Sequence, residues 1–243
     1  MNRDQLHFGQ LSWPGSERQR KRSWERKVTK LLRKARLPIS VQRTFDHRLD
    51  MVSLEQVNNL YLLLTSVLVS KVPGAVVELG CHTGSTTTVL GQILQCQPKP
   101  PALHVYDLFE GAWSPEESVL DRFKANHAAV GIPLPYIHQG DVLKTIPTDL
   151  PSAIAFAHID LGVGGEHERH EVLVTHALES MYPRLAPHGV LVLMDYHVPG
   201  LTVDGNDSNP SVRKACDAYF INKREKVITL YGGPCSHGFV RKQ

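Results

Sequence analysis

The sequence is poor in cysteine and has no long apolar run. Its 243 residues include four cysteines, none in a CxxC pair, which argues against both a zinc knuckle and a disulfide framework. The longest apolar stretch, residues 60–69, is interrupted by Thr65 and Ser66 and is shorter than the roughly 20 residues that a membrane-spanning helix needs. No basic start leads into an apolar run with a cleavage site. We therefore expect no secretory signal, no membrane span, and a cytoplasmic protein with free thiols.

The charge of the chain is divided unevenly along its length. Hydrophobic residues make up 42% and charged residues 21%, which is typical of a globular protein and excludes a disordered or fibrous chain. The net charge is +3, yet residues 16–36 hold six Arg and four Lys against two Glu, a local charge of +8. Because Arg3 and Asp4 cancel, the chain after Arg36 carries −5. A mildly acidic body thus follows a basic N-terminal arm.

Two helices are expected before the first strand. Residues 16–36 form one of them, because apolar residues recur there at helical spacing, and Pro38 ends it. A second helix starts after Ser53, where Gln56 completes the glutamine form of a capping box. We assign residues 1–52 to a basic helical arm and residues 53–243 to one domain. The apolar stripe of the first helix comprises Trp24, Val28, Leu31, Leu32 and Ala35.

Beyond this point short β-branched runs alternate with helical segments. Such alternation predicts a parallel sheet covered by helices on both faces. The last two runs are joined by a short turn and read as a hairpin. The fold class is therefore α/β, a doubly wound, mostly parallel seven-stranded sheet with an antiparallel last strand, preceded by N-terminal helices. Strands are expected at 75–79, 103–107, 136–138, 153–159, 189–195, 226–230 and 238–240, and helices at 85–96, 115–129, 168–182 and 210–220.

The turn after the first strand is the most informative segment. Glu78, Gly80 and Gly84 form the pattern E-x-G-x-x-x-G, in which the glycines permit a tight turn and a close approach to a ligand. Ser85 is expected to cap the following helix. The pattern lacks the third glycine of G-x-G-x-x-G and has an acid in the strand, and both features disfavour a diphosphate at this turn.

Acidic residues follow the second and third strands as well. Asp107 is placed to accept hydrogen bonds from ribose hydroxyls, and Asp141 suits an adenine amino group. Each acid read alone is equally well explained as a helix cap. Their order and spacing together indicate a nucleoside site without phosphates.

These segments resemble the class I S-adenosylmethionine-dependent methyltransferases, and in particular the macrocin O-methyltransferase family, over residues 45–220. The resemblance lies in the runs VPGAVVELG (72–80), YDLFEG (106–111) and MYPRL (181–185), with Gly189 and the Asp195–Tyr196 pair. That family methylates sugar hydroxyls of natural products and uses a divalent metal. The resemblance places the methionine part of the cofactor at Glu78, Gly80 and Gly84, the ribose at Asp107 and the adenine at Asp141, with His82, Ser85, Leu108 and Val142 as further cofactor contacts.

Histidine and aspartate recur together at the fourth and fifth strand ends. Residues two apart in a strand share a face, so His158 pairs with Asp160, and Asp195 with His197. Asp160, Asp195 and His197 are candidate ligands for Mg²⁺, and His197 or His158, together with Asp160, is the candidate catalytic group. The chain departs from the family pattern, because Leu161 and Gly162 follow Asp160 where a second acid is usual, and Met194 precedes Asp195. His167 and His170 read as solvated loop residues.

The leading hypothesis is a methyltransferase that uses S-adenosylmethionine, with Mg²⁺ as a candidate second cofactor, to methylate a hydroxyl of a small acceptor, a sugar or other secondary metabolite. One rival is an RNA methyltransferase that uses the basic arm. The scarcity of aromatic side chains in the arm makes nucleic acid the less favoured partner. Another rival is a non-catalytic nucleoside-binding protein of the same fold. We expect the basic helix to dock on its own domain, helping to cover the active site, or to form a contact in a homo-oligomer.

Overall fold

The computed structural model describes residues 23–37, 52–110, 118–162, 165–201, 207, 209–232 and 235–243. The chain divides into two units, Met1–Thr44 and Phe45–Gln243, which are treated separately. In the first unit the described element is α1 (Ser23–Lys34). It lies within the helix expected at 16–36, whose residues 16–22 are outside the described part. None of the described helices is both long enough and apolar enough to cross a bilayer.

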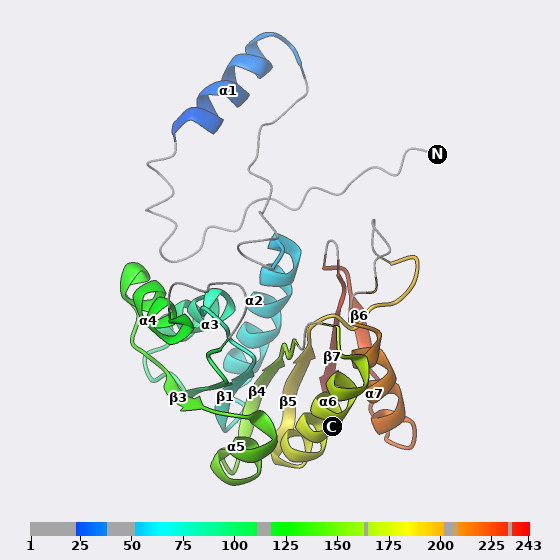
Figure 1. Cartoon of the computed structure of the whole chain (residues 1–243). Helices are drawn as coiled ribbons and strands as arrows, with labels where there is room; N and C mark the ends of the chain where they lie inside the picture. Colours follow the sequence, from blue (N-terminus) through cyan, green and yellow to red (C-terminus); the bar gives the residue numbers. More distant parts are fainter. Residues whose placement is uncertain are drawn as a thin grey trace. The chain divides into compact units, whose positions relative to one another are not determined.

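The second unit is built on one sheet, which has seven strands within the described residues (Figure 1). Their order across the sheet is β3-β2-β1-β4-β5-β7-β6. Neighbours among the first five strands pair in parallel, and β7 pairs antiparallel with both β5 and β6. The predicted fold class is thereby confirmed. The strands are β1 (Ala75–Leu79), β2 (Leu103–Asp107), β3 (Tyr136–Gln139), β4 (Ile154–Ile159), β5 (Leu185–Leu193), β6 (Ile228–Leu230) and β7 (His237–Arg241).

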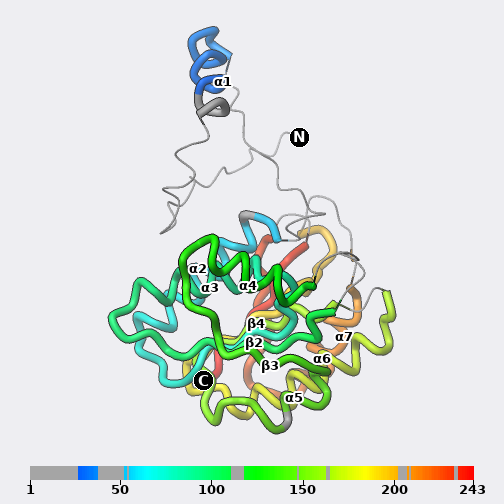
Figure 2. Tube along the Cα trace, turned by 60° about the vertical axis from the view of Figure 1, so that its left-hand side comes forward, coloured from blue at the N-terminus to red at the C-terminus, as the bar shows by residue number. Residues whose placement is uncertain are grey.

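Helices cover both faces of the sheet (Figures 1 and 2). On one face α2 (Leu54–Val69), α3 (Ser85–Gln95) and α4 (Val119–Val130) pack in sequence, and on the other α5 (Val142–Asp149), α6 (His167–Met181) and α7 (Pro210–Phe220) do the same. A 3-10 turn at Tyr182–Arg184 follows α6. Every residue of β1 and β4 is buried, as expected for central parallel strands covered on both sides. The largest core cluster joins these strands to α6 and α7.

The start of α2 confirms the predicted capping box. The Ser53 hydroxyl accepts a hydrogen bond from the Gln56 backbone N–H at 3.1 Å, and the Gln56 side chain accepts one from the Ser53 N–H at 2.8 Å. The Ser53 hydroxyl also donates to the carbonyl of Gly232. Gln56 donates from Nε2 to the Cys235 carbonyl. The start of α2 is thus held against the segment that joins β6 to β7.

Three local expectations differ from the structure. Helix α5 was not anticipated, because Pro147 lies inside it and a proline ordinarily ends a helix. Strand β5 begins at Leu185, four residues before the expected start at 189. The cap of α3 is Gly84 in the left-handed conformation with no side-chain hydrogen bond, and Ser85 is the first helical residue. The expected start of α4 at 115 lies outside the described residues.

The order of the strands sets the place of a ligand site. The chain runs outward from β1 to β2 and β3, then returns to β4 on the other side of β1. In open parallel sheets the crevice at such a switch point, beyond the carboxyl ends of the strands, is where ligands bind. The loops that follow β1 and β4 therefore flank the candidate site.

Candidate active site

The turn after β1 is held in an unusual backbone conformation. Gly80, His82 and Gly84 all have positive φ, at +76°, +44° and +83°, which only glycine adopts without strain. A Cβ atom at Gly80 would lie 1.8 Å from the carbonyl oxygen of Asp160, and one at Gly84 would lie 2.7 Å from the Phe123 ring. Both glycines are therefore required by protein packing, in addition to any approach of a ligand.

Asp107, at the end of β2, fixes this turn. One carboxylate oxygen accepts a hydrogen bond from the His82 N–H at 2.7 Å and the other from the Phe109 N–H at 2.6 Å. Each oxygen keeps a lone pair, so a half-buried, pre-oriented carboxylate remains able to accept two hydroxyl donors. Leu108, beside it, leaves 43% of its surface exposed. This is the acceptor that ribose hydroxyls require, with an apolar side chain next to it.

Asp141 has the capping role considered for it, and its contact with adenine stays a prediction. It is the N-cap of α5, where Oδ1 accepts a hydrogen bond from the Leu143 N–H at 3.0 Å. Val142 is buried in the main core cluster, so that only its backbone can face a ligand. Leu143 is 37% exposed. Its side chain lies in a surface groove with Val172 of α6 and Lys214 of α7, so Leu108 is the exposed apolar side chain next to Asp107. The residues present thus fit the nucleoside part of S-adenosylmethionine.

Glu78 and His158 form a buried pair across β1 and β4. They are register partners in the sheet, and Nδ1 of His158 lies 3.1 Å from Oε1 of Glu78. Thr87 of α3 donates its hydroxyl hydrogen to the other oxygen of Glu78. Both side chains of the pair are fully buried. Burial opposes the charged imidazolium, but the hydrogen bond to Glu78 and the charges of Glu78, Asp160 and Asp195 outweigh it, and the pKa of His158 is raised. Glu78 therefore faces protein groups rather than an open site.

Asp160 follows β4 at the crevice. Its backbone N–H donates to the Leu79 carbonyl at 2.9 Å, which joins the loops after β1 and β4. Burial raises the pKa of its carboxyl to about 7; His158 opposes the shift, whereas the nearby carboxylates of Asp195 and Glu78 add to it. A carboxyl with a pKa near 7 is well matched to proton transfer at neutral pH.

The end of β5 differs from the expected geometry. The strand ends at Leu193, and Asp195 has a left-handed backbone with φ +58°. The alternation rule for strands therefore does not place Asp195 and His197 on one face. Oδ2 of Asp195 accepts a hydrogen bond from the Asn209 side chain at 2.6 Å. His197 is 3% exposed, and its Nδ1 has no partner among the described residues.

Three residues around Asp195 were not anticipated as parts of the site. Asn209 comes from the residue before α7. The Cys235 thiol has its pKa raised to about 12 by burial and by the charge and hydrogen bond of Asp195. His170 of α6, expected to be a solvated loop residue, is 1% exposed, and burial lowers its pKa while Asp195 opposes the shift. Within residues 167–181, helical spacing places His170 on the same face as the buried residues Leu173, Val174 and Ala177. This spacing could have indicated from the sequence that His170 is buried.

The predicted metal ligands do not form a ligand set in the part of the chain that is described. No group of three or more His, Cys, Asp or Glu side chains there is arranged to hold a metal ion. The charges of Asp160 and Asp195 both raise the pKa of His158, so the two carboxyl groups act on the same imidazole. The Asp195 carboxylate, however, accepts its hydrogen bond from Asn209. The assignment of Asp160, Asp195 and His197 to Mg²⁺ stays a prediction.

Comparisons with known proteins agree with this geometry. Residues 77–196 match the family model described as a methyltransferase domain. The solved structures that the chain resembles include the O-methyltransferase NovP, with TM-score 0.62 and 18% identity over 79% of this chain and 81% of that one. A Bacillus cereus O-methyltransferase in complex with SAH gives TM-score 0.56 and 17% identity over 90% and 91% of the two chains. CalS11, a TDP-rhamnose 3'-O-methyltransferase of calicheamicin biosynthesis, gives 0.52 and 19% over 98% and 99%.

No curated protein sequence matches the chain significantly. The matched domain contains the turn after β1, Asp107, Asp141, Asp160 and Asp195, which are the residues that the geometry gathers at the carboxyl ends of the strands. At these identities the structural neighbours establish the fold, and the domain match adds the enzyme class. The chain thus carries a methyltransferase domain over residues 77–196, built on the fold of the class I S-adenosylmethionine-dependent methyltransferases.

Proposed function

We propose that the enzyme transfers the methyl group to a hydroxyl of a small acceptor, a sugar or other secondary metabolite. The observation that carries the proposal is the position of Asp160. Asp160 directly follows β4, beside the crevice between β1 and β4, and its carboxyl has a pKa of about 7, which suits it to accept the proton of a hydroxyl group. The names of the structural neighbours NovP and CalS11, both O-methyltransferases, support the same reaction.

Each residue of the candidate site would have a separate role in the reaction. S-adenosylmethionine, when bound, would supply an electrophilic methyl group, whose bond to sulfur breaks in the transfer and leaves S-adenosylhomocysteine. Asp107 would accept hydrogen bonds from the ribose hydroxyls, and Asp141 one from the adenine amino group. Asp160, as carboxylate, would take the hydroxyl proton while the acceptor oxygen attacks the methyl carbon. Thr87 hydrogen-bonds to Glu78, and Glu78 in turn hydrogen-bonds to His158. The charge of His158 lowers the pKa of the Asp160 carboxyl and so partly opposes the effect of burial. Positioning of the two reactants supplies most of the rate effect.

The proposal is tested by methyl transfer from isotopically labelled S-adenosylmethionine to a panel of sugars, glycosides and phenols. We expect a labelled product in which the methyl carbon is bound to oxygen, as identified by NMR. The same assay with folded structured RNA and with amines separates O-methylation from its rivals. Label found only in RNA or only on nitrogen would contradict the proposal, and SAH binding without transfer to any class would favour the non-catalytic alternative.

A further inference from the structure

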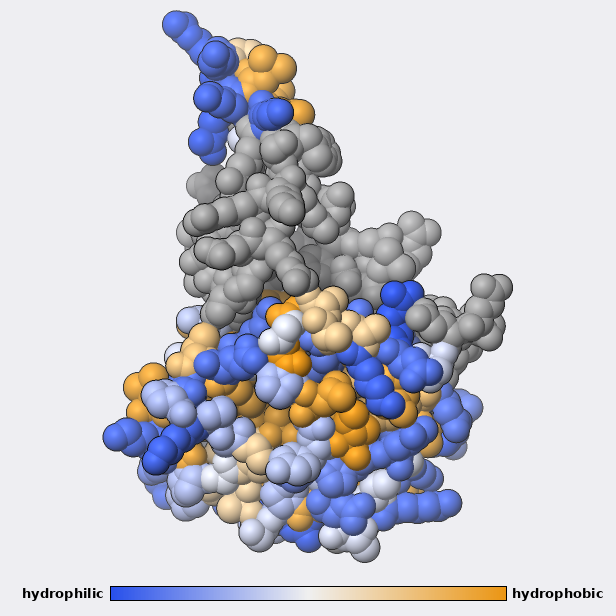
Figure 3. All heavy atoms as spheres, turned by 90° about the vertical axis from the view of Figure 1, so that its left-hand side faces the viewer, coloured by the Kyte–Doolittle hydropathy of each residue, from blue (hydrophilic) through white to orange (hydrophobic). Residues whose placement is uncertain are grey.

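Helix α1 carries an apolar stripe along one of its sides. Val28, Leu31 and Leu32 lie at i, i+3 and i+4 and so share one side of the helix. Leu31 leaves 67% of its surface exposed, which is unusual for a leucine at the centre of such a stripe. Figure 3 shows the two sides of this helix, hydrophilic atoms along one and hydrophobic atoms along the other. Twelve residues are also about the lower limit for a helix that is stable alone in water.

The end of α1 extends the apolar stripe. Arg36 has φ +58°, its N–H donates to the Arg33 carbonyl, and the Leu37 N–H donates to the Leu32 carbonyl, both at 3.0 Å. This pair of bonds is a Schellman motif, in which the residue after the left-handed position turns back toward the last turn of the helix. Leu37, 45% exposed, therefore continues the side that carries Leu32.

The other side of the helix is cationic. Residues 27–36 contain five Lys or Arg and no acid. Lys27 and Lys34, seven residues apart, lie along one border of the stripe, and Lys30 and Arg33 lie farther round the helix. Long basic side chains beside an apolar stripe can extend their charged ends into a lipid headgroup layer while their stems cover apolar surface. Each such charge near an anionic membrane contributes about 1 kcal/mol.

We propose that α1, with Leu37, binds an anionic lipid surface, lying in the plane of the interface with Val28, Leu31, Leu32 and Leu37 toward the acyl chains. A polyanion such as RNA would use the cations but leave the leucines in water. Docking on the protein's own domain or on a second subunit would bury the leucines against a body of charge −5, and such a contact would not respond to the lipid headgroup. An interfacial helix uses both features. The enzyme would then bring its active site to acceptors held at, or released from, a membrane surface.

The test uses the full chain and vesicles of phosphatidylcholine with or without phosphatidylglycerol. We expect sedimentation with the anionic vesicles only, weakened by salt, and an increase in helical circular dichroism on binding. Leu31→Glu should reduce the vesicle affinity by about tenfold or more, because a leucine side chain buried in apolar surroundings contributes about 1.5–3 kcal/mol. Lys30→Glu should reduce it as well.

Matched controls separate this site from general effects. Leu62→Glu changes a leucine that is 61% exposed on α2, and Lys144→Glu reverses an exposed lysine of α5; neither should alter vesicle binding. The proposal is overturned if the wild-type chain ignores phosphatidylglycerol. It is also overturned if Leu31→Glu binds vesicles as the wild type does, because that substitution both removes an apolar side chain from the stripe and adds a negative charge. Loss of a dimer in the Leu31→Glu variant, without wild-type vesicle binding, would assign the stripe to a subunit contact.

Discussion

The glycine at residue 80 shows how closely the two halves of the sheet meet at the crevice. Its Cα lies against the Asp160 backbone, so that no side chain fits between them. The sequence suggested that this glycine serves a ligand, whereas the structure gives it a second task, the contact between the loops after β1 and β4. Any change here moves the turn that would hold the cofactor and, with it, the candidate base Asp160.

Gly80→Ala should therefore destabilise the fold strongly. The new methyl group would meet the Asp160 carbonyl and the residue would keep a positive φ, and we expect a loss of at least about 3 kcal/mol in the free energy of unfolding. Urea denaturation measures it. Gly162→Ala is the matched control, because nothing lies within 4 Å of a Cβ there, and it should stay within about 0.5 kcal/mol. Equal stability of the two variants would disprove the packing argument.

Asp160→Asn tests the candidate base separately from cofactor binding. The amide cannot accept the hydroxyl proton, so we expect the methyl-transfer rate to fall by about 100-fold or more, while the affinity for S-adenosylhomocysteine changes little. Labelled-methyl transfer and calorimetry give the two values. Asp121→Asn, on the exposed side of α4, should leave both unchanged. A rate for Asp160→Asn close to that of the wild type would remove Asp160 from the reaction.

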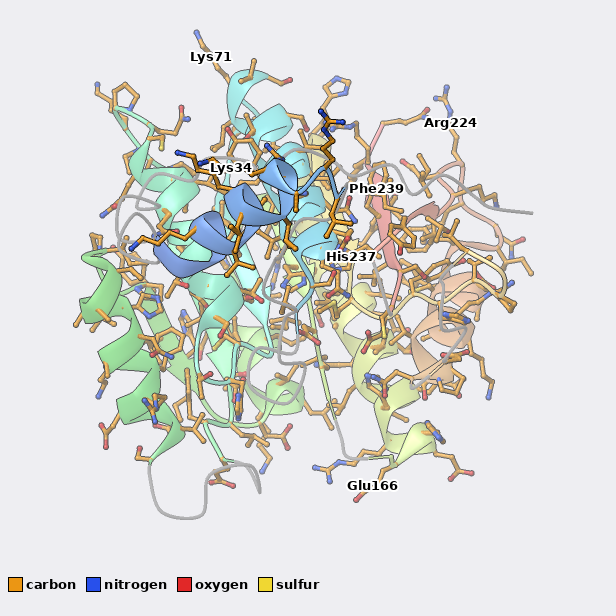
Figure 4. All side chains as sticks on the ribbon, turned by 90° about the horizontal axis from the view of Figure 1, so that it is seen from above. Lys34, Lys71, Glu166, Arg224, His237 and Phe239 are labelled. Carbon is orange, nitrogen blue, oxygen red and sulfur yellow. The ribbon has the colours of Figure 1, made fainter. Side chains whose placement is uncertain are left out.

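His237 should make the fold sensitive to acid. It is fully buried in β7, in the interior seen in Figure 4, and Nε2 lies 3.0 Å from the Met194 sulfur. Burial, assisted by the charge of His158, lowers its pKa to about 3. A histidine in the unfolded chain has a pKa near 6.5, so between about pH 3 and pH 6.5 the unfolded chain binds one more proton than the folded chain. The contribution of His237 to stability is therefore full above about pH 6.5. It is lost as the pH falls below that value, by about 1.4 kcal/mol per pH unit.

Unfolding of the wild type and of His237→Gln between pH 4 and 7 measures this dependence. The variant should lose less stability than the wild type over the acid range, although it starts from a lower value at pH 7. His167→Gln, at an exposed residue of α6, should follow the wild type. Parallel curves for wild type and His237→Gln would show that another group causes the acid sensitivity.

At the scale of elements, a buried chain of side chains joins helix α3, β1 and β4. Thr87, Glu78 and His158 follow one another at hydrogen-bond distance with no exposed surface on the last two. An ionised group buried without a partner is very costly, so these three residues specify the register of β1 against β4. That register in turn places the loops that flank the crevice.

The capping box of α2 is a second feature that stabilises the arrangement of the elements. Ser53→Ala removes the bond to the Gln56 N–H and the bond to the buried Gly232 carbonyl, and we expect a loss of about 1–2 kcal/mol in the free energy of unfolding. Thermal or urea unfolding measures it. Ser70→Ala at the exposed other end of α2 is the control. No difference between the two would mean that the cap and its link to Gly232 contribute nothing.

Regular elements were predictable where local signals agreed. β1, β2 and α7 have the expected bounds, because β-branched runs, a strand-end acid and an initial proline mark them. Helix α5 was missed although Asp141 had been considered as a helix cap, because Pro147 lies inside the short segment that follows it and a proline is a poor signal for a helix. Ser85 was taken for a cap because side-chain capping is the common solution, whereas Gly84 uses backbone conformation instead.

The part of the site around Asp107 and Asp141 was predictable from the sequence, whereas the part around Asp195 was less so. Asp107 and Asp141 follow ordinary strands, so topology alone gathers them at one edge. Asp195 has a positive φ, which ends the alternation that would place His197 beside it. Asn209 lies fourteen residues away in sequence, and no local pattern connects the two. Contacts made across loops depend on tertiary packing that a single sequence does not show.

At the scale of the whole molecule, charge is separated along the chain. The loops after β2, β4 and β5 span residues 108–118, 160–166 and 194–209, and together they contain eight Asp or Glu and no Lys or Arg. The N-terminal arm carries +8. This acidic sequence disfavours a polyanionic acceptor such as RNA. The basic excess instead lies in the N-terminal arm, whose helix α1 we propose binds a lipid surface.

Calorimetric titration with S-adenosylhomocysteine tests the central claim, that the carboxyl ends of the strands hold a nucleoside cofactor. We predict binding to the wild type and an affinity about 10- to 100-fold weaker for Asp107→Ala, which loses hydrogen bonds to a charged group, with Asp121→Ala unchanged. The Asp107→Asn variant, which can still accept the His82 N–H bond, separates lost ligand contacts from a disordered turn. Absence of binding to the wild type at millimolar ligand, or equal affinity of wild type and Asp107→Ala, would contradict the account.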